Sequence, residues 1–164
     1  MTGNVPFSDM LVYLDGSEGS MSAAMYAVLL AKGTGSRLHA LYCINTKALG
    51  DLVKARIFIN QEKAEYMDDM GKDARRHIRH IEKLAHSKGV EVTGVIVDGS
   101  PSAEVLRYIK DNHVDLLVLG SVNMIRSRRE ELTSESDRML RTSPCPVLVA
   151  RDDESIWQMF EELD

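Results

Sequence analysis

Five short runs that are rich in apolar residues alternate with longer amphipathic stretches along this chain. Such runs are typical of strands, and the one that ends at Gly120 has the pattern of a strand buried on both faces of a parallel sheet. They occupy residues 10–14, 38–44, 90–97, 115–119 and 146–150. The repeated alternation of strand and helix predicts an α/β fold, in which a five-stranded parallel sheet carries helices on both faces.

Apolar positions that recur every three or four residues predict the helices between the runs. The first helix follows the strand at residues 10–14 and ends at Gly33 or Gly35. Glycine is the usual residue at such a stop because it adopts a positive φ without strain. A second, long helix covers residues 62–87, and a third has Ser100 as its cap and Pro101 as its first residue.

Three histidines, His77, His80 and His86, lie in the long helix. No set of carboxylates or cysteines accompanies them at metal-ligand spacing. We therefore expect them on the charged, solvated face of this helix, and we expect no metal site.

Residues 45–61 have the least regular pattern. The segment has the length and position of a loop that covers a site or crosses a dimer surface. An ordinary start of the next helix is an equally good interpretation.

Polar positions follow two of the predicted strands directly. A turn that begins at Asp15 follows the first strand, and Gly120 ends the fourth. The carboxyl ends of parallel strands are where open α/β sheets bind ligands. Further along, Ser134 or Thr133 can cap a helix whose N-terminus offers backbone N–H groups to an anion.

The loop after the fourth strand has the spacing of a nucleotide-binding motif, G-x2-G-x9-G-[ST]. Its four positions are occupied by Gly120, Asn123, Thr133 and Ser134. With the opening stretch YLDGSEGSMSAAMYAVLLAKGTGSRLHALYCI and the closing stretch TSPCPVLVAR, this spacing resembles the universal stress protein family. The resemblance covers residues 10–151 and implies the strand order 3-2-1-4-5, a Rossmann-like sheet with a ligand crevice between the first and fourth strands.

The resemblance also implies a ligand. Family members with the motif bind ATP or another adenine nucleotide, with or without Mg²⁺. The carboxylate that matches Asp15 accepts hydrogen bonds from ribose hydroxyls or the adenine amine, and the backbone at Cys43 would meet the adenine edge. From its position alone, Asp15 is equally a turn or cap residue, and the two roles are compatible.

Two motif glycines are replaced, by Asn123 and Thr133. Asparagine tolerates a positive φ, whereas a β-branched threonine is a poor occupant of that region and brings a methyl group near a phosphate. Arg126, Arg128 and Arg129 can compensate as phosphate ligands or simply solvate the loop. A decayed ligand site, in a protein that acts only through protein contacts, is the alternative interpretation.

The resemblance implies a homodimer that pairs through the last strand, which starts at Pro146 and ends at Ala150. Residues 1–151 would form the universal stress protein domain, and residues 152–164 a helical tail capped by Asp153. Ile156, Trp157, Phe160 and Leu163 share one face of this tail. That face docks on its own subunit or grips a partner.

Composition narrows the remaining classes. The chain has 164 residues, which suit one domain, and its formal net charge of −5 argues against a nucleic-acid or membrane-surface binder. No apolar run has the length of a membrane helix, and the N-terminus lacks the pattern of a signal peptide, so the expected compartment is the cytoplasm. Cys43 and Cys145 have no metal-ligand spacing and are expected to be buried thiols.

No set of residues predicts an enzyme. The chain has no H-x-G-H, no S-G-G-x-D-S loop and no Ser/His/Asp set that can be nominated. At most we expect weak ATP hydrolysis. Asp15 is the candidate for positioning the attacking water, and it is a poor one. The leading hypothesis is a cytoplasmic, homodimeric nucleotide-binding module of the stress response, in which the ligand orders the loop at residues 121–132.

Overall fold

The computed structural model describes residues 6–54, 60–120 and 134–163. All five predicted strands are present and parallel, in the order β3-β2-β1-β4-β5. The strands are β1 (Asp9–Leu14), β2 (Arg37–Asn45), β3 (Val92–Gly99), β4 (Leu116–Gly120) and β5 (Val147–Ala150). The predicted fold class and strand order are therefore confirmed.

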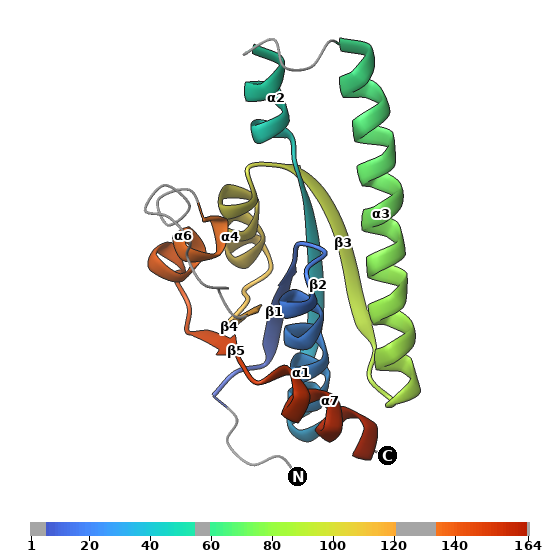
Figure 1. The fold of residues 1–164 in the computed structure, drawn as a ribbon. Helices are drawn as coiled ribbons and strands as arrows, with labels where there is room; N and C mark the ends of the chain where they lie inside the picture. The colour runs from blue at the N-terminus through green and yellow to red at the C-terminus, as the bar shows by residue number, and fades with distance from the viewer. Residues whose placement is uncertain (1–5, 55–59, 121–133, 164) are drawn as a thin grey trace.

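Helices cover both faces of the sheet (Figure 1). One face carries α1 (Glu18–Thr34), α3 (Asn60–Ser87) and α7 (Asp153–Glu162). The other carries α4 (Pro101–Asp111) and α6 (Glu135–Thr142). A further helix, α2 (Thr46–Lys54), leads toward the upper end of α3, beyond the sheet (Figure 1).

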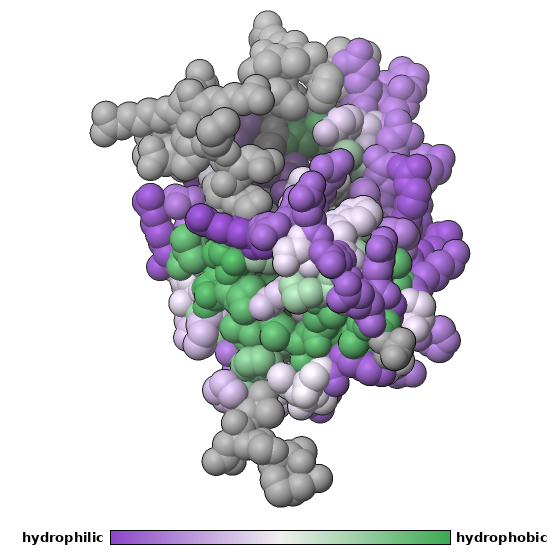
Figure 2. Space-filling model, turned by 60° about the horizontal axis from the view of Figure 1, so that its bottom comes forward, coloured by the Kyte–Doolittle hydropathy of each residue, from purple (hydrophilic) through white to green (hydrophobic). Residues whose placement is uncertain are grey.

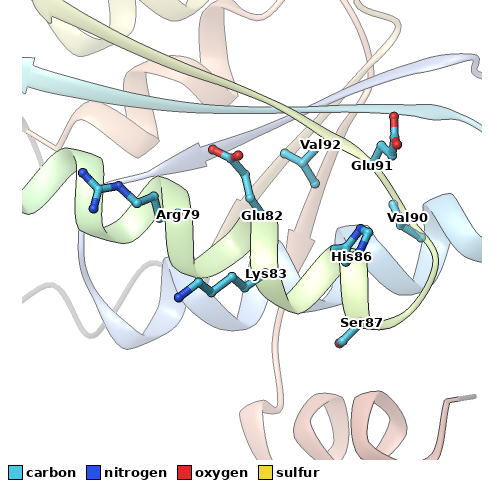
Figure 3. A pocket seen from close by; sticks show the side chains of 8 residues that line it. All are labelled: Arg79, Glu82, Lys83, His86, Ser87, Val90, Glu91 and Val92. Atoms are coloured by element: carbon cyan, nitrogen blue, oxygen red, sulfur yellow. The ribbon is translucent and has the colours of Figure 1, made fainter.

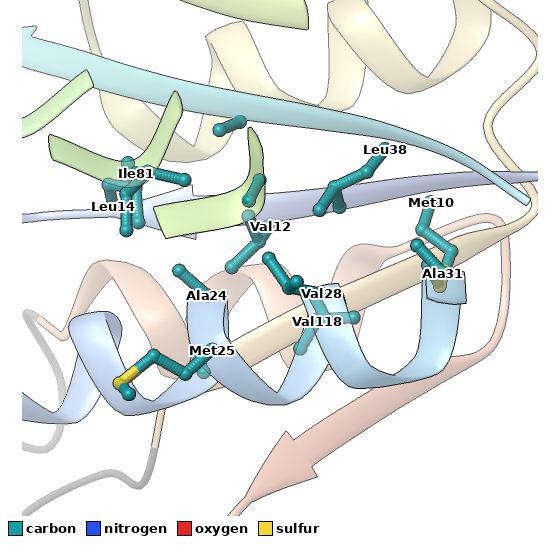
Figure 4. Packing of buried hydrophobic residues seen from close by; sticks show 14 of the residues in the cluster. Met10, Val12, Leu14, Ala24, Met25, Val28, Ala31, Leu38, Ile81 and Val118 are labelled. Atoms are coloured by element: carbon teal, nitrogen blue, oxygen red, sulfur yellow. The ribbon is translucent and has the colours of Figure 1, made fainter. Parts of the chain in front are cut away.

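The core has two layers because alternate residues of a strand point to opposite faces. Met10, Val12 and Leu14 of β1 pack with α1, α3 and α7, as Figure 4 shows for part of this layer. Leu11 and Tyr13 pack against α4 and α6. All five residues are at most 6% exposed, so β1 is the buried centre of the molecule.

Most element boundaries agree with the predictions to within two residues, and two differences are instructive. The third strand was expected at residues 90–97 but runs over Val92–Gly99, and Val90 is buried in the turn that precedes it. Residues 46–54, expected as loop or helix start, form the separate helix α2. Its apolar residue Leu49 is 2% exposed, so tertiary packing supports a helix too short to be stable alone.

The amino end of the sheet carries an ion pair between the buried Asp9 carboxylate and the exposed Arg37 guanidinium. Arg37 donates two hydrogen bonds to the Asp9 carboxylate, at 2.9 and 2.8 Å. His39 lies between Asp9, at 3.2 Å, and the hydroxyl of Tyr108, at 2.7 Å. This network ties β1, β2 and α4 together at the end of the sheet opposite to the predicted ligand crevice.

The tail folds back on its own subunit. Ile156 and Phe160 are buried against the α1 layer, and the Lys88 ammonium lies 5.0 Å from the centroid of the Phe160 ring. The predicted cap was wrong by one residue: Asp152, not Asp153, accepts a hydrogen bond from the Ser155 N–H. Asp152 lies in the left-handed region, with a φ of 67°.

Within the described residues, no helix has the length and apolar character needed to span a bilayer. The same part of the chain contains no cluster of three or more potential metal-ligating side chains.

Candidate functional site

The carboxyl ends of β1 and β4 form the point at which the strand order reverses. The chain passes outward from β1 to β2 and β3 in one direction, and from β4 to β5 in the other. Val12 pairs with Val118, and continuing this register places Gly120 level with Leu14, one residue before Asp15. Helices lie on opposite faces on the two sides of such a point, which leaves a crevice above the strand ends.

Asp15 organises the turn after β1. Its Oδ1 accepts hydrogen bonds from the Ser17 N–H at 2.9 Å and the Ser17 hydroxyl at 2.5 Å. The Ser17 Oγ in turn accepts the Ser20 N–H and caps α1. The turn role of Asp15 is therefore present, and its Oδ2 accepts no hydrogen bond within the described residues.

The Asp15 turn rests on two aromatic rings. Tyr42 of β2 and His77 of α3 are stacked, with ring centroids 5.6 Å apart and planes at 11°. A Cβ on Gly16, whose φ is +85°, would lie 3.3 Å from the Tyr42 hydroxyl and from His77 Nε2. Burial, followed by the charge of Asp15, raises the pKa of Tyr42 above its ordinary value.

The expectation of a solvated face was wrong for His77, although His80 and His86 are exposed. The signal was available in the sequence: His77 lies three residues after Ala74 and four before Ile81, two buried residues of α3. A residue at these spacings lies along the edge of the apolar face.

Position 120 requires glycine because a side chain would not fit there, not because of its backbone dihedral angles. A Cβ at this position would lie 2.5 Å from the Gly19 carbonyl oxygen and 2.9 Å from the Ser20 nitrogen. Both atoms belong to the first turn of α1. The end of β4 is thus in backbone contact with the helix that follows Asp15, which joins the two sides of the crevice.

Two helix N-termini lie together on the other face. Ser134 caps α6 by accepting the Asp137 N–H at 3.3 Å, as predicted. Ser100 takes the expected cap position of α4 but makes no side-chain cap bond. Instead, Glu135 accepts the Ser102 N–H at 2.9 Å, so a carboxylate from α6 caps α4.

Cys43 is 6% exposed, and burial raises the pKa of its thiol to about 12. Its side chain packs in the α4 layer, so a contact with a ligand in the crevice would have to come from its backbone. Burial and then the charge of Asp15 raise the pKa of Tyr13, with a further contribution from Glu135. Asp15 and Glu135 therefore surround the same buried tyrosine near the strand ends.

The described part of the site is acidic, with Asp15 on one side and Glu135 on the other. Arg138 offsets part of this charge, because its Nη1 lies 3.6 Å from Glu135 Oε1. The other predicted ligand-binding residues lie outside the described part of the chain: Asn123, Arg126, Arg128, Arg129 and Thr133.

A hollow of about 520 Å³ lies between α3 and the start of β3 (Figure 3). It is beside Val90 and Val92, at the amino end of the sheet. Its charged side chains are of both signs: Arg79 and Lys83 line it together with Glu82 and Glu91. Neither its position nor its charge indicates a particular ligand.

Comparisons with known proteins agree with this geometry. The universal stress protein YxiE of Bacillus subtilis is 30% identical over 151 residues, which is 88% of this chain and 99% of YxiE. The structure of the universal stress protein UspA from Lactobacillus plantarum superposes with a TM-score of 0.72 at 24% identity, covering 90% of this chain and all of UspA.

A universal stress protein family protein from Arabidopsis thaliana, with AMP bound, shares the fold. It has a TM-score of 0.62 at 17% identity and covers 90% of this chain and 94% of its own. The profile of the universal stress protein family matches residues 6–151, which include both strand ends of the crevice and the whole sheet. On this match, the chain belongs to the universal stress protein family.

Proposed function

We propose that this protein is a regulatory module that binds an adenine nucleotide in the crevice between β1 and β4. The observation that carries the proposal is the register that sets Gly120 beside the Asp15 turn, with the capped N-terminus of α6 following β4 along the chain. The AMP in the structure of the Arabidopsis relative supports an adenine nucleotide as the ligand class.

The ligand contacts follow from the groups that remain available. Asp15 Oδ2 would accept a hydrogen bond from a ribose hydroxyl or the adenine amine, while Oδ1 holds the turn. The backbone at Cys43 and Gly120, with Asn123, Thr133 and Ser134, would complete the site. Helix N-termini, such as that of α6, attract phosphate through their N–H groups.

Charge decides how many phosphates the site can hold. Asp15 and Glu135 both repel an anion, and Arg138 is already engaged by Glu135. A triphosphate therefore requires Mg²⁺ or the loop arginines Arg126, Arg128 and Arg129 to neutralise it. We propose that ATP binds as its magnesium complex and that binding alters the surface seen by a partner protein. The loop at residues 121–132, which was expected to respond to the ligand, lies outside the described part of the chain.

We also propose a cytoplasmic homodimer that pairs through β5. β5 is an edge strand, and Val147, Leu148 and Val149 are only partly buried. An apolar edge is an aggregation hazard unless it is paired. Figure 2 shows hydrophobic residues gathered on one face at the lower end of the molecule, with hydrophilic residues on either side of them. This apolar face supports the proposal that a second subunit covers part of the surface.

The protein acts by binding rather than by turnover, with weak ATP hydrolysis as the upper limit. A nucleotide-independent module is the second candidate, and the replacement of two motif glycines by Asn123 and Thr133 favours it. In that case the dimer surface and the tail carry the function.

The test is calorimetric titration of nucleotide-free protein with magnesium ATP and with AMP. Asp15→Ala should abolish binding because it removes the ligand-facing oxygen. Ser17→Ala is the matched control: it removes the hydroxyl that Asp15 and the α1 cap use, and it leaves Asp15 Oδ2 in place. Absence of binding by the unaltered protein, or equal loss in both variants, would contradict the proposal.

If the motif has decayed, the double variant Asn123→Gly and Thr133→Gly should gain the affinity that the natural chain lacks. A turnover assay with and without Mg²⁺ then separates simple binding from hydrolysis.

A further inference from the structure

A pocket of about 390 Å³ lies between α1 and α7, apart from the residues assigned to the nucleotide. Pockets that bind small groups have volumes from about 300 Å³ upward. The pocket is lined by Glu18, Ser22, Asp153, Glu154, Trp157, Gln158 and Glu161. Five of these residues lie on α7, beyond the last residue matched by the family profile.

Trp157 forms a fixed aromatic wall of this pocket. Its indole N–H donates to the Ser22 hydroxyl at 3.3 Å, and Ser22 is 1% exposed. Its neighbours Ile156 and Phe160 anchor α7 in the core. Trp157 is nevertheless 48% exposed, so its only polar atom is satisfied while much of the ring is left for a partner.

The remaining charge of the pocket is entirely negative. Glu18, Asp153, Glu154 and Glu161 line it, and no basic side chain of the described chain does. None of the four carboxylates takes part in an ion pair within the described residues. The ring of Trp157 therefore lies among four carboxylates that have no ion-pair partner in the described ranges.

Helix electrostatics explain only part of this arrangement. Glu18 lies in the first turn of α1, and Asp153 and Glu154 lie in the first turn of α7, where carboxylates are favourable. Glu161 lies in the last turn of α7, where a carboxylate is unfavourable. The helix dipole therefore does not account for a carboxylate at this position beside Trp157.

The aromatic ring and the carboxylates together indicate which chemical group fits the pocket. A π face attracts a cation electrostatically, and carboxylates around it add directional hydrogen-bond acceptors. Guanidinium suits both at once, because it is planar, stacks on indole and binds carboxylate through two N–H groups. A compact ammonium group would use the charges but not the flat face.

We propose that the α1–α7 pocket docks an arginine-bearing basic segment of a partner protein. The guanidinium stacks on Trp157 and is held by the carboxylates of Glu154 and Glu161. The carboxylates steer the segment toward the pocket, and the indole anchors it, as buried tryptophans do at many interfaces. This docking does not depend on the nucleotide.

The test uses the intrinsic fluorescence of Trp157, the only tryptophan in the chain. The probe is a short peptide without aromatic residues that carries two arginines, and its control replaces both arginines with citrulline, which keeps the shape and removes the charge. The arginine peptide should give a saturable change that weakens as salt is added, and the citrulline peptide should give none.

Variants separate a site from general charge attraction. Glu154→Gln with Glu161→Gln should weaken the peptide at least about tenfold. Asp51→Asn with Glu65→Gln removes the same net charge from exposed positions of α2 and α3, at the opposite end of the molecule, and should leave binding unchanged (Figure 1). Equal weakening in both pairs would overturn the proposal, as would no saturable response to millimolar peptide.

Two further readouts keep the result independent of folding and of the nucleotide site. Circular dichroism and thermal unfolding should be the same for both double variants, because all four positions are exposed. Asp15→Ala should retain peptide binding even where it loses nucleotide, and Glu154→Gln with Glu161→Gln should retain nucleotide binding. Loss of peptide binding in Asp15→Ala would assign the peptide to the crevice and overturn the proposal.

Discussion

Replacing Gly120 with alanine tests whether β4 and α1 meet in the crevice as the structure places them. The added Cβ would lie 2.5 Å from the Gly19 carbonyl oxygen, 2.6 Å from its carbon and 2.9 Å from the Ser20 nitrogen. All three are backbone atoms of α1, so no side chain can rotate away to relieve the overlap. Either the helix or the end of β4 must shift.

Overpacking of this kind typically costs about 1–3 kcal/mol. We expect the free energy of unfolding of Gly120→Ala, measured in urea, to fall by that amount. The melting temperature should fall by about 2–4 °C for each kcal/mol in a domain of this size. Because the shift opens the crevice, nucleotide affinity should fall as well.

Gly33→Ala is the matched control. Gly33 lies inside α1, and a Cβ there would meet nothing within 4 Å. Alanine should therefore stabilise the helix by about 0.5 kcal/mol, through its higher helix propensity. A Gly120→Ala variant that is as stable as the natural protein, or that behaves like Gly33→Ala, would refute the contact between β4 and α1.

Three further predictions address the sheet ends and the tail. The two hydrogen bonds from Arg37 hold the pKa of Asp9 in the folded protein below its ordinary value of 3.8, so folding favours the ionised carboxylate. This contribution to stability is fully present above pH 3.8 and is lost as the pH falls through the pKa of Asp9 in the folded protein. Urea unfolding at a series of acidic pH values should show this loss in the natural protein, and Asp9→Asn should reduce it; an unchanged acid slope would contradict the assignment. Cys43 should resist alkylation at pH 8 in the folded protein and react in denaturant, as peptide mass spectrometry can measure, because burial raises its pKa to about 12; rapid labelling of the folded state would refute this. Asp152→Ala should lower the free energy of unfolding by about 1 kcal/mol and Asp153→Ala by only a few tenths, because Asp152 is the N-cap of α7. Equal losses of stability in thermal unfolding would contradict the assignment of Asp152 as the cap.

Local patterns in the sequence were sufficient where the cause of a structure is itself local. The apolar runs at β1 and β4 predict strands buried on two faces, as they are in the structure, and the strand–helix alternation predicts a parallel sheet. The stop of α1 at Gly35 and the cap at Ser134 follow from dihedral freedom and from a side-chain oxygen within one turn. The resemblance to a known family supplied the strand order, which the paired strands confirm.

Tertiary structure decided the features that depend on residues distant in the chain. His77 is held by Tyr42, 35 positions earlier, and the N-terminus of α4 is capped by Glu135 of another helix. A short helix such as α2 gains its stability from packing, so its own sequence gives only a weak signal.

The tail shows the same division within one helix. The sequence predicted an apolar face with Ile156, Trp157 and Phe160, and left open which surface that face covers. In the fold, Ile156 and Phe160 are buried in the core, and Trp157 is turned to Ser22 at the edge of an acidic pocket. Helical periodicity determines which residues share a face, but the angle at which that face meets the rest of the molecule depends on contacts that only the folded chain contains.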